Sequence, residues 1–255
     1  MPEQFVESTY EADVATLTLD RQPHNIMNIE MMEQVNSALL DLRDHRELKV
    51  LVIRGRGPAF CGGVEIGDHT REKVGRMMQV FHRIFDTMRM LDVIAISAVD
   101  GPALGGGFEL AIGCNMVLAS ESATFALPQI DMGVFPPLAA VVLPRASLRR
   151  KAMEWILTGE EISAQELERF GLVNRVFPDD QFEEKLQEFV GKLTAKSGPV
   201  LQLAKRAQFE AYYSAYEEAL SKVENLYLRN LMALEDAREG IESKLQGRKP
   251  EWRNA

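Results

Sequence analysis

The sequence has few cysteines, no long apolar run and no signal segment. Its 255 residues include only Cys61 and Cys114, which lie too far apart to form a disulfide framework. No apolar run approaches the roughly 20 residues that span a bilayer. The first residues, MPEQFVESTYEADVATL, have no basic segment followed by an apolar one, so no secretion signal is predicted. These absences predict a soluble protein of a reducing compartment, the cytoplasm.

Positive charge is also in deficit. The formal net charge is −9, which argues against nucleic acid or an anionic membrane as the main partner. A small anionic molecule remains compatible with a locally positive site. The content of 46% hydrophobic and 26% charged residues is that of a globular domain with ample core material.

Several catalytic signatures are missing as well. There is no Gly-x-Ser-x-Gly element, and the four histidines are scattered, so a nucleophilic triad is not expected. Cys61 is interpreted as a small buried side chain. No His, Asp or Glu spacing indicates a metal site, and no cofactor is predicted.

The pattern of elements predicts an α/β fold. Half-buried or buried strands are expected at 12–20, 48–57, 93–101 and 171–177. Helices are expected at 29–43, with Asn28 as N-cap, and at 70–91, 139–157, 163–170, 181–196 and 198–246. Residues 108–120 are predicted to pass from a short helix into a strand. Strands alternating with helices indicate βα units, and the helical tail would cover this core or pack on another subunit.

The stretch ALGGGFEL (103–110) raises the question of what three successive glycines do. It fits neither a Walker loop nor a Gly-x-Gly-x-x-Gly dinucleotide fingerprint. Glycines before a helix can leave backbone N–H groups free for an oxygen that gains charge, with Glu109 as acid or base beside it. The alternative is that small residues let the helix pack closely on a strand. Spacing alone slightly favours the packing interpretation.

A second glycine loop, RGRGPAFCGGVEIGDH (54–69), could supply another N–H to the same oxygen. With it, a series of motifs resembles the enoyl-CoA hydratase/isomerase (crotonase) family in order along the chain. These are AFCGGVEI, AISAVDGPALGGGFELAIGCNMVLAS, ATFALPQIDMGVFPP and LTGEEISAQELERFGLVNRV. The resemblance implies a spiral of ββα turns with a helical C-terminal region, over 1–197 and 198–255 of a single domain.

The resemblance also implies roles for individual residues. The oxyanion-hole amides would be those of Val64 and Gly106, and the first catalytic glutamate would be Glu109. The second family glutamate falls on Gln129, a departure, because an amide can orient a water but cannot transfer a proton. That glutamine is either natural or a substitution that traps substrate. The implied substrate-binding residues are Gly62, Gly63, Val64, Ile66, Gly105, Gly106 and Phe135.

Asp131 lies two residues beyond Gln129 and could be considered as a substitute carboxylate. Residues two apart in an extended segment are about 6–7 Å apart. We therefore interpret Asp131 as a surface or structural carboxylate.

A narrower resemblance comes from GVEIGDHTREKVGRMMQVFHRIF and GVFPPLAAVVLPR. These stretches are similar to hydratases of cyclohexa-1,5-diene-1-carbonyl-CoA in anaerobic aromatic degradation. The implied reaction is addition of water to a cyclic dienoyl thioester, with coenzyme A as part of the substrate. Alternatives are a 2-enoyl-CoA hydratase, a single-carboxylate isomerase and a non-catalytic acyl-CoA-binding protein. The resemblance further implies homotrimers or homohexamers.

Overall fold

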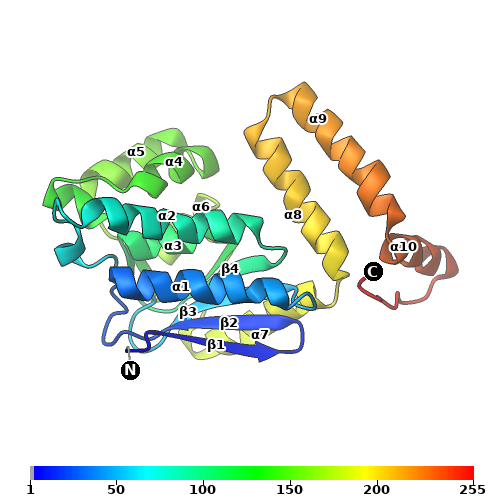
Figure 1. Ribbon diagram of the computed structural model, residues 1–255, viewed down its shortest axis with the longest axis horizontal. Helices are drawn as coiled ribbons and strands as arrows, with labels where there is room; N and C mark the ends of the chain where they lie inside the picture. Colours follow the sequence, from blue (N-terminus) through cyan, green and yellow to red (C-terminus); the bar gives the residue numbers. More distant parts are fainter. Residues whose placement is uncertain (1–2) are drawn as a thin grey trace.

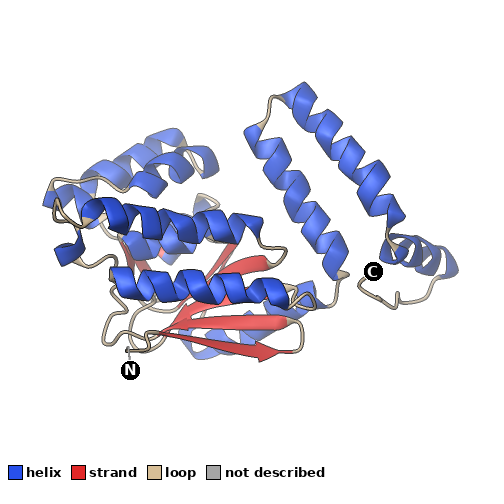
Figure 2. Cartoon of the chain, in the orientation of Figure 1, coloured by secondary structure: helices blue, strands red, loops and turns tan. Residues whose placement is uncertain are grey.

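The computed structural model describes residues 3–255 and, within them, every side chain except that of Tyr213. Its main sheet has the order β1-β2-β3-β4-β6-β9. The first two strands form an antiparallel hairpin and every other pairing is parallel. Figure 2 shows this sheet in red between helical layers. The strands are β1 Val6–Glu11, β2 Val14–Leu19, β3 Val50–Gly55, β4 Ile94–Val99, β6 Met116–Ser120 and β9 Arg175–Phe177.

The central strands are buried on both faces because helices cover both sides, as parallel strands require. Val50 and Val52 of β3 pack with Phe182 and Leu186 of α7 (Phe182–Thr194) in a small core. The alternate residues Leu51 and Ile53 belong to the larger core on the other side of the sheet. That core also contains the buried faces of α1 (Ile29–Asp41) and α2 (Val74–Met90).

A second, three-stranded sheet has the order β5-β7-β8 and supports the site described below. Strand β5 leads directly into α3, whose residues 106–111 are all buried. The strands are β5 Ala103–Leu104, β7 Thr124–Ala126 and β8 Ile162–Ser163. The helices of this part are α3 Gly106–Gly113, α4 Pro137–Ala146, α5 Arg149–Thr158 and α6 Ala164–Arg169. Short helical turns are η1 Leu42–Asp44, η2 Ile66–Asp68, η3 Pro128–Met132 and η4 Asp179–Gln181.

The last helices form an arm that extends away from the sheet (Figure 1). They are α8 Gly198–Tyr213, α9 Tyr216–Asn225 and α10 Glu235–Gln246, with the turns η5 Leu226–Asn230 and η6 Leu231–Ala233 between the last two. Lys205 joins α8 to the core, because its Nζ donates to the carbonyls of Met88, Leu91 and Val93 at 2.8–3.2 Å. These carbonyls lie at and beyond the C-terminal end of α2, where a cation is favourable.

Most predicted elements are present, with corrections at their ends. Asn28 caps α1, accepting from the N–H of Met31. The helix predicted from Thr70 begins at Val74, because no side chain caps the residues before it. Strand β1 was missed: only Val6 of it is buried, so it has no apolar alternation, as expected of an exposed edge.

The helices predicted at 139–157 and 198–246 are not continuous. The first is two helices separated by Ser147 and Leu148, and the second is divided into the helices of the arm. The expected strand at 171–177 is confined to 175–177, because the preceding residues form a turn around Gly171, which has a φ of +77°.

Candidate functional site

Two glycine-bearing loops lie side by side at the ends of β3 and β4. Cys61 and Ala103 form an isolated parallel bridge, and the N–H of Leu104 donates to the carbonyl of Cys61 at 2.9 Å. The backbones are so close that a Cβ added to Gly107 would lie 2.1 Å from the carbonyl oxygen of Cys61. The packing interpretation of the glycines is therefore correct for Gly107.

The same contact brings two backbone amides together. The N–H of Met27 donates to the carbonyl of Gly63, and the N–H of Glu65 donates to the carbonyl of Met27. The N–H of Val64, which lies between these two, is not bonded to Met27. The Gly106 N–H is the first of α3, and such groups have no partner within the helix. A Cβ added to Gly106 would lie 2.6 Å from Val64 Cγ2 and 3.6 Å from Val64 N. Neither N–H donates to another group in the described part of the chain.

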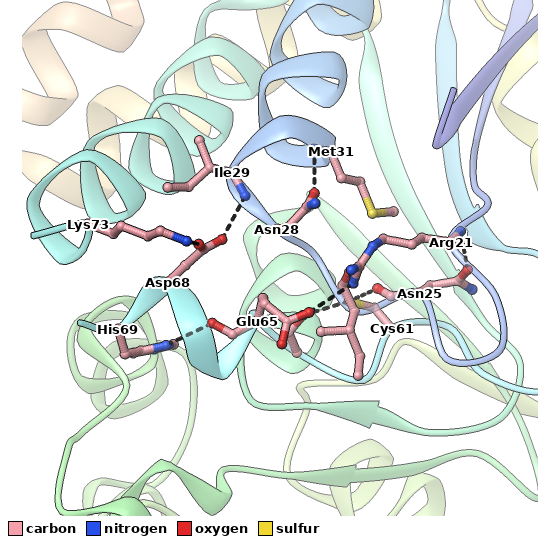
Figure 3. A network of polar contacts seen from close by, with 12 residues as sticks. Arg21, Asn25, Asn28, Ile29, Met31, Cys61, Glu65, Asp68, His69 and Lys73 are labelled. Atoms are coloured by element: carbon pink, nitrogen blue, oxygen red, sulfur yellow. Dashed lines mark hydrogen bonds and ion pairs between the residues drawn. The ribbon is translucent and has the colours of Figure 1, made fainter. Parts of the chain in front are cut away.

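A polar network fixes the loop that carries Val64 (Figure 3). Arg21 donates to the carbonyl of Ile26 at 2.7 Å and pairs with Glu65 at 3.2 Å. Asp68, which is buried, accepts from the N–H of Ile29 at 3.0 Å and pairs with Lys73 at 3.1 Å. These contacts tie the loop to the start of α1 and to the segment before α2. The Val64 amide is thus part of a loop that the side chains of Glu65 and Asp68 fix in place.

Glu109 lies one turn into α3, with its side chain only 2% exposed. Its Oε1 accepts from the N–H of Ala139 at 2.9 Å, and Ala139 belongs to the first turn of α4. Burial raises the pKa of the Glu109 carboxyl to about 7, although hydrogen bonds from the backbone of Ala139 and Leu138 act in the opposite direction. A carboxyl with this pKa can both accept and release a proton near neutral pH.

Gln129 lies in η3 and is also buried. Its Nε2 is 3.4 Å from Glu109 Oε2, a long hydrogen bond. Its Oε1 has no hydrogen-bond partner among residues 3–255. A Cβ added to Gly105, which has a φ of +52°, would lie 3.4–3.6 Å from the amide of Gln129. The glutamine therefore lies beside both Glu109 and the residue that precedes the Gly106 amide.

The structure thus brings Gly105, Gly106, Glu109 and Gln129 together. Val64 and Gly63 lie against the same turn, since a Cβ added to Gly63 would be 3.8 Å from Gly106 N. Gly62 precedes Gly63 in the loop, and its N–H donates to the carbonyl of His24.

Two other predicted positions lie outside this cluster. Ile66 and Phe135 are at the surface, with 68% and 64% of each residue exposed. They do not take part in the hydrogen bonds that join Glu109 to its neighbours. Asp131 is also exposed, and its Oδ2 lies near Gly159 rather than near Glu109.

Sequence reasoning missed the α4 amides that contact Glu109. The signal was Pro136 and Pro137, which favour a helix start just before Ala139, and Ala139 lies 30 residues along the chain from Glu109. Cys61 is buried and free, and burial raises the pKa of its thiol to about 12, which makes it a poor nucleophile. Among residues 3–255, no three His, Cys, Asp or Glu side chains lie close enough to hold a metal ion. No helix in that range is both long and apolar enough to cross a membrane.

Two free backbone amides beside a buried, titratable carboxyl define a site that can stabilise an oxyanion and transfer a proton. The class of protein that this defines is an α/β protein with two free backbone amides beside a buried carboxyl at a strand-to-helix turn. Comparison with protein families matches residues 9–255 to the family described as enoyl-CoA hydratase/isomerase. The chain therefore belongs to the enoyl-CoA hydratase/isomerase (crotonase) family.

Individual relatives agree with this membership. The chain is 32% identical over 232 residues to the mitochondrial enoyl-CoA hydratase domain-containing protein 3 of Mus musculus, covering 89% of this chain and 77% of the relative. It is 32% identical over 242 residues to the probable enoyl-CoA hydratase echA8 of Mycobacterium tuberculosis, covering 94% of each.

Solved structures match over almost the entire length. The crystal structure of human enoyl-CoA hydratase domain-containing protein 3 superimposes with a TM-score of 0.93 at 29% identity, covering 98% of this chain and 100% of that one. Enoyl-CoA hydratase of Mycobacterium smegmatis gives a TM-score of 0.93 at 27% identity, covering 98% and 99%. The predicted fold, a crotonase-like α/β core with a helical C-terminal region, is confirmed.

Proposed function

We propose that the protein is an acyl-CoA hydratase that adds water to a conjugated cyclic dienoyl thioester, cyclohexa-1,5-diene-1-carbonyl-CoA. The observation that carries the hydratase proposal is the buried Glu109 carboxyl beside the free amides of Val64 and Gly106. Membership of the enoyl-CoA hydratase/isomerase family supports a CoA thioester as the substrate. The cyclic acyl group is supported by the resemblance carried by residues 63–85 and 133–145.

The amides would act on the thioester carbonyl. Both N–H groups would donate to its oxygen, which gains negative charge as the carbonyl becomes an enolate. Because these donors are backbone groups fixed by the contact between the two loops, they need no rearrangement during the reaction. Removal of one such donor typically costs about 3–4 kcal/mol of transition-state stabilisation.

Glu109 would transfer the proton. A water molecule has two O–H groups, and the site offers two acceptors for them, the Glu109 carboxylate and the free Oε1 of Gln129. As the water oxygen bonds to the β-carbon, one of its O–H bonds breaks and Glu109 takes that proton. The electrons of the double bond move to the thioester oxygen as a dienolate. Glu109 then returns the proton to the far end of the dienolate, which completes a 1,4-addition.

A substrate comparison tests the proposal. The purified protein is incubated separately with crotonyl-CoA, a 3-enoyl-CoA and cyclohexa-1,5-diene-1-carbonyl-CoA, and the products are separated and weighed by mass spectrometry. We expect water addition to the cyclic diene at the highest kcat/KM. Preference for crotonyl-CoA would support an ordinary 2-enoyl-CoA hydratase, and conversion of the 3-enoyl-CoA without a mass change would support an isomerase. Binding of all three without turnover would overturn the enzymatic proposal.

A further inference from the structure

The two ends of the Gln129 amide have different surroundings. Nε2 is the end next to Glu109, at 3.4 Å from Oε2, whereas Oε1 is free. An N–H donor stabilises a carboxylate, which can only accept, more than a carboxylic acid. Since Oε1 of Glu109 already accepts from Ala139, both of its oxygens face donors. This arrangement matches the ionised form of Glu109.

Among residues 3–255, the hydrogen-bond partners of the Glu109 carboxyl are the Gln129 amide and backbone N–H groups, none of which is ionisable. The strands β4, β5 and β6 and the helices α4 and α2 pack against α3, with Phe81 of α2 beside Gly106 and Phe85 beside Gly113. The ionisable residues Arg76, Arg83, Asp86 and Arg89 of α2 are exposed, and His82 is half-buried, with no hydrogen-bond partner for its Nε2 among the described residues. Those three strands carry no ionisable residue, and the one charged residue of α4 is the exposed Arg145 in its last turn. On the η3 side, Asp131 is exposed and lies near Gly159.

On the Val64 side of the site, the carboxylates of Glu65 and Asp68 are each paired with a basic side chain. Glu65 is paired with Arg21, and the buried Asp68 is paired with Lys73 (Figure 3). His69 Nδ1 lies 3.2 Å from the carbonyl oxygen of Glu65 rather than near Glu109. Among the described residues, the carboxyl of Glu109 therefore has no ionisable hydrogen-bond partner.

We propose that Gln129 is a positioning residue that holds Glu109 in its proton-accepting form and leaves it as the single proton-transfer group of the site. This inference rests on the proposed function for its kinetic consequence. With one group in place of two, the proton that Glu109 takes from water is the one that it returns to carbon. Catalysis then requires one ionisation, that of Glu109, and no second group has to stay protonated.

The pH dependence of kcat/KM tests this role. For the wild type we expect a rise with a slope of one near pH 7 and then a plateau, up to the pH at which the protein unfolds. Gln129→Met keeps the apolar stem but removes the donor, and should move the rise upward by about one pH unit. Gln129→Glu places two carboxyls side by side, which titrate as a coupled pair. In this variant kcat/KM should rise and then fall with pH, which gives a bell-shaped profile in place of the plateau. Asp131→Asn is the matched control and should leave the profile unchanged.

A measurement without substrate separates this inference from the proposed function. The carboxyl carbon of Glu109 is followed by ¹³C NMR in glutamate-labelled protein and assigned by its loss in Glu109→Gln. An upward move of its titration in Gln129→Met, with unchanged circular dichroism, supports the positioning role even if no tested thioester is turned over. The same titration in wild type and Gln129→Met would overturn it, as would a bell-shaped wild-type profile.

Discussion

Two buried carboxylates, one in the core and one in the arm, are surrounded in different ways. Asp236, at the start of α10, is 1% exposed, and its two oxygens accept from the N–H groups of Arg253 and Asn254 at 2.7 and 3.0 Å. Glu109 is 2% exposed; its Oε1 accepts from the N–H of Ala139 at 2.9 Å, the Leu138 amide also acts on the carboxyl, and its Oε2 has a side-chain donor at 3.4 Å. At similar burial, each oxygen of Asp236 has a backbone donor within 3.0 Å, whereas the donor to Glu109 Oε2 is a side chain at 3.4 Å.

The difference separates a carboxylate with two close backbone donors from one that is less completely hydrogen-bonded. Asp236 joins the last residues of the chain to α10, and its hydrogen bonds offset the cost of burying it. Glu109 is left with an incompletely solvated charge, and this is what allows it to take up a proton near neutral pH. The same chemical change, carboxylate to amide, should therefore have opposite effects at the two positions.

The largest expected effect is on turnover by Glu109→Gln. The amide keeps the shape of the side chain but cannot transfer a proton, so kcat should fall by about 10²–10⁴-fold. Steady-state kinetics with the substrate proposed above would measure this. Asp236→Asn is the matched carboxylate-to-amide control and should change kcat far less. Undiminished turnover in Glu109→Gln would contradict the assigned mechanism.

The next largest effect is expected for Gly106→Ala. The added Cβ would lie 2.6 Å from Val64 Cγ2, so the Val64 side chain must move or the two loops must separate, and either change disturbs the surroundings of the two amides. Loss of one such donor should lower kcat by about 10²–10³-fold. Gly75→Ala provides the control, because it lies in α2 with nothing within 4 Å of its Cβ. If both variants keep full kcat, the loop contact does not position the donors.

Glu109→Gln should also stabilise the protein at high pH. The folded-state pKa of Glu109, about 7, is above its ordinary value of 4.5, so the folded state binds more protons between these values. Wild-type stability therefore falls as pH rises through this window, and the neutral variant avoids that loss. We expect a gain of about 1–3 kcal/mol at pH 8 and little at pH 4, measured by urea unfolding. A variant that is less stable at pH 8 would contradict this sign.

Asp236→Asn should have the opposite effect on stability. The amide nitrogen would face a backbone N–H that needs an acceptor, which should cost about 1–3 kcal/mol. Hydrogen exchange would localise the loss to α10 and the last residues of the chain. Asp131→Asn, at an exposed position, should change stability by less than about 0.5 kcal/mol. Equal protection of α10 in wild type and Asp236→Asn would show that this carboxylate does not hold the arm.

Local sequence signals predicted the elements around the site better than the contacts between them. Asn28 as N-cap and the buried strand around Val50 follow from neighbouring residues, and both are present. The glycines of 103–110 signalled a close approach, but not that Cys61 would be the neighbour of Gly107. The Ala139 amide could not be assigned to Glu109, because the pair depends on how α3 and α4 pack. Exposed β1 and the breaks in the arm lack a periodic apolar pattern for the same physical reason: little of either is buried.

The neutral side chain at position 129 also has a genetic consequence. The codons of glutamine and glutamate differ in one base, and the two side chains have nearly the same shape. The setting of Gln129, against Gly105 and Glu109, could therefore accept either residue without rebuilding the backbone. A single nucleotide change would then be enough to move a lineage between a site with one carboxylate and a site with two. Such a lineage could change its chemistry while its fold stays the same.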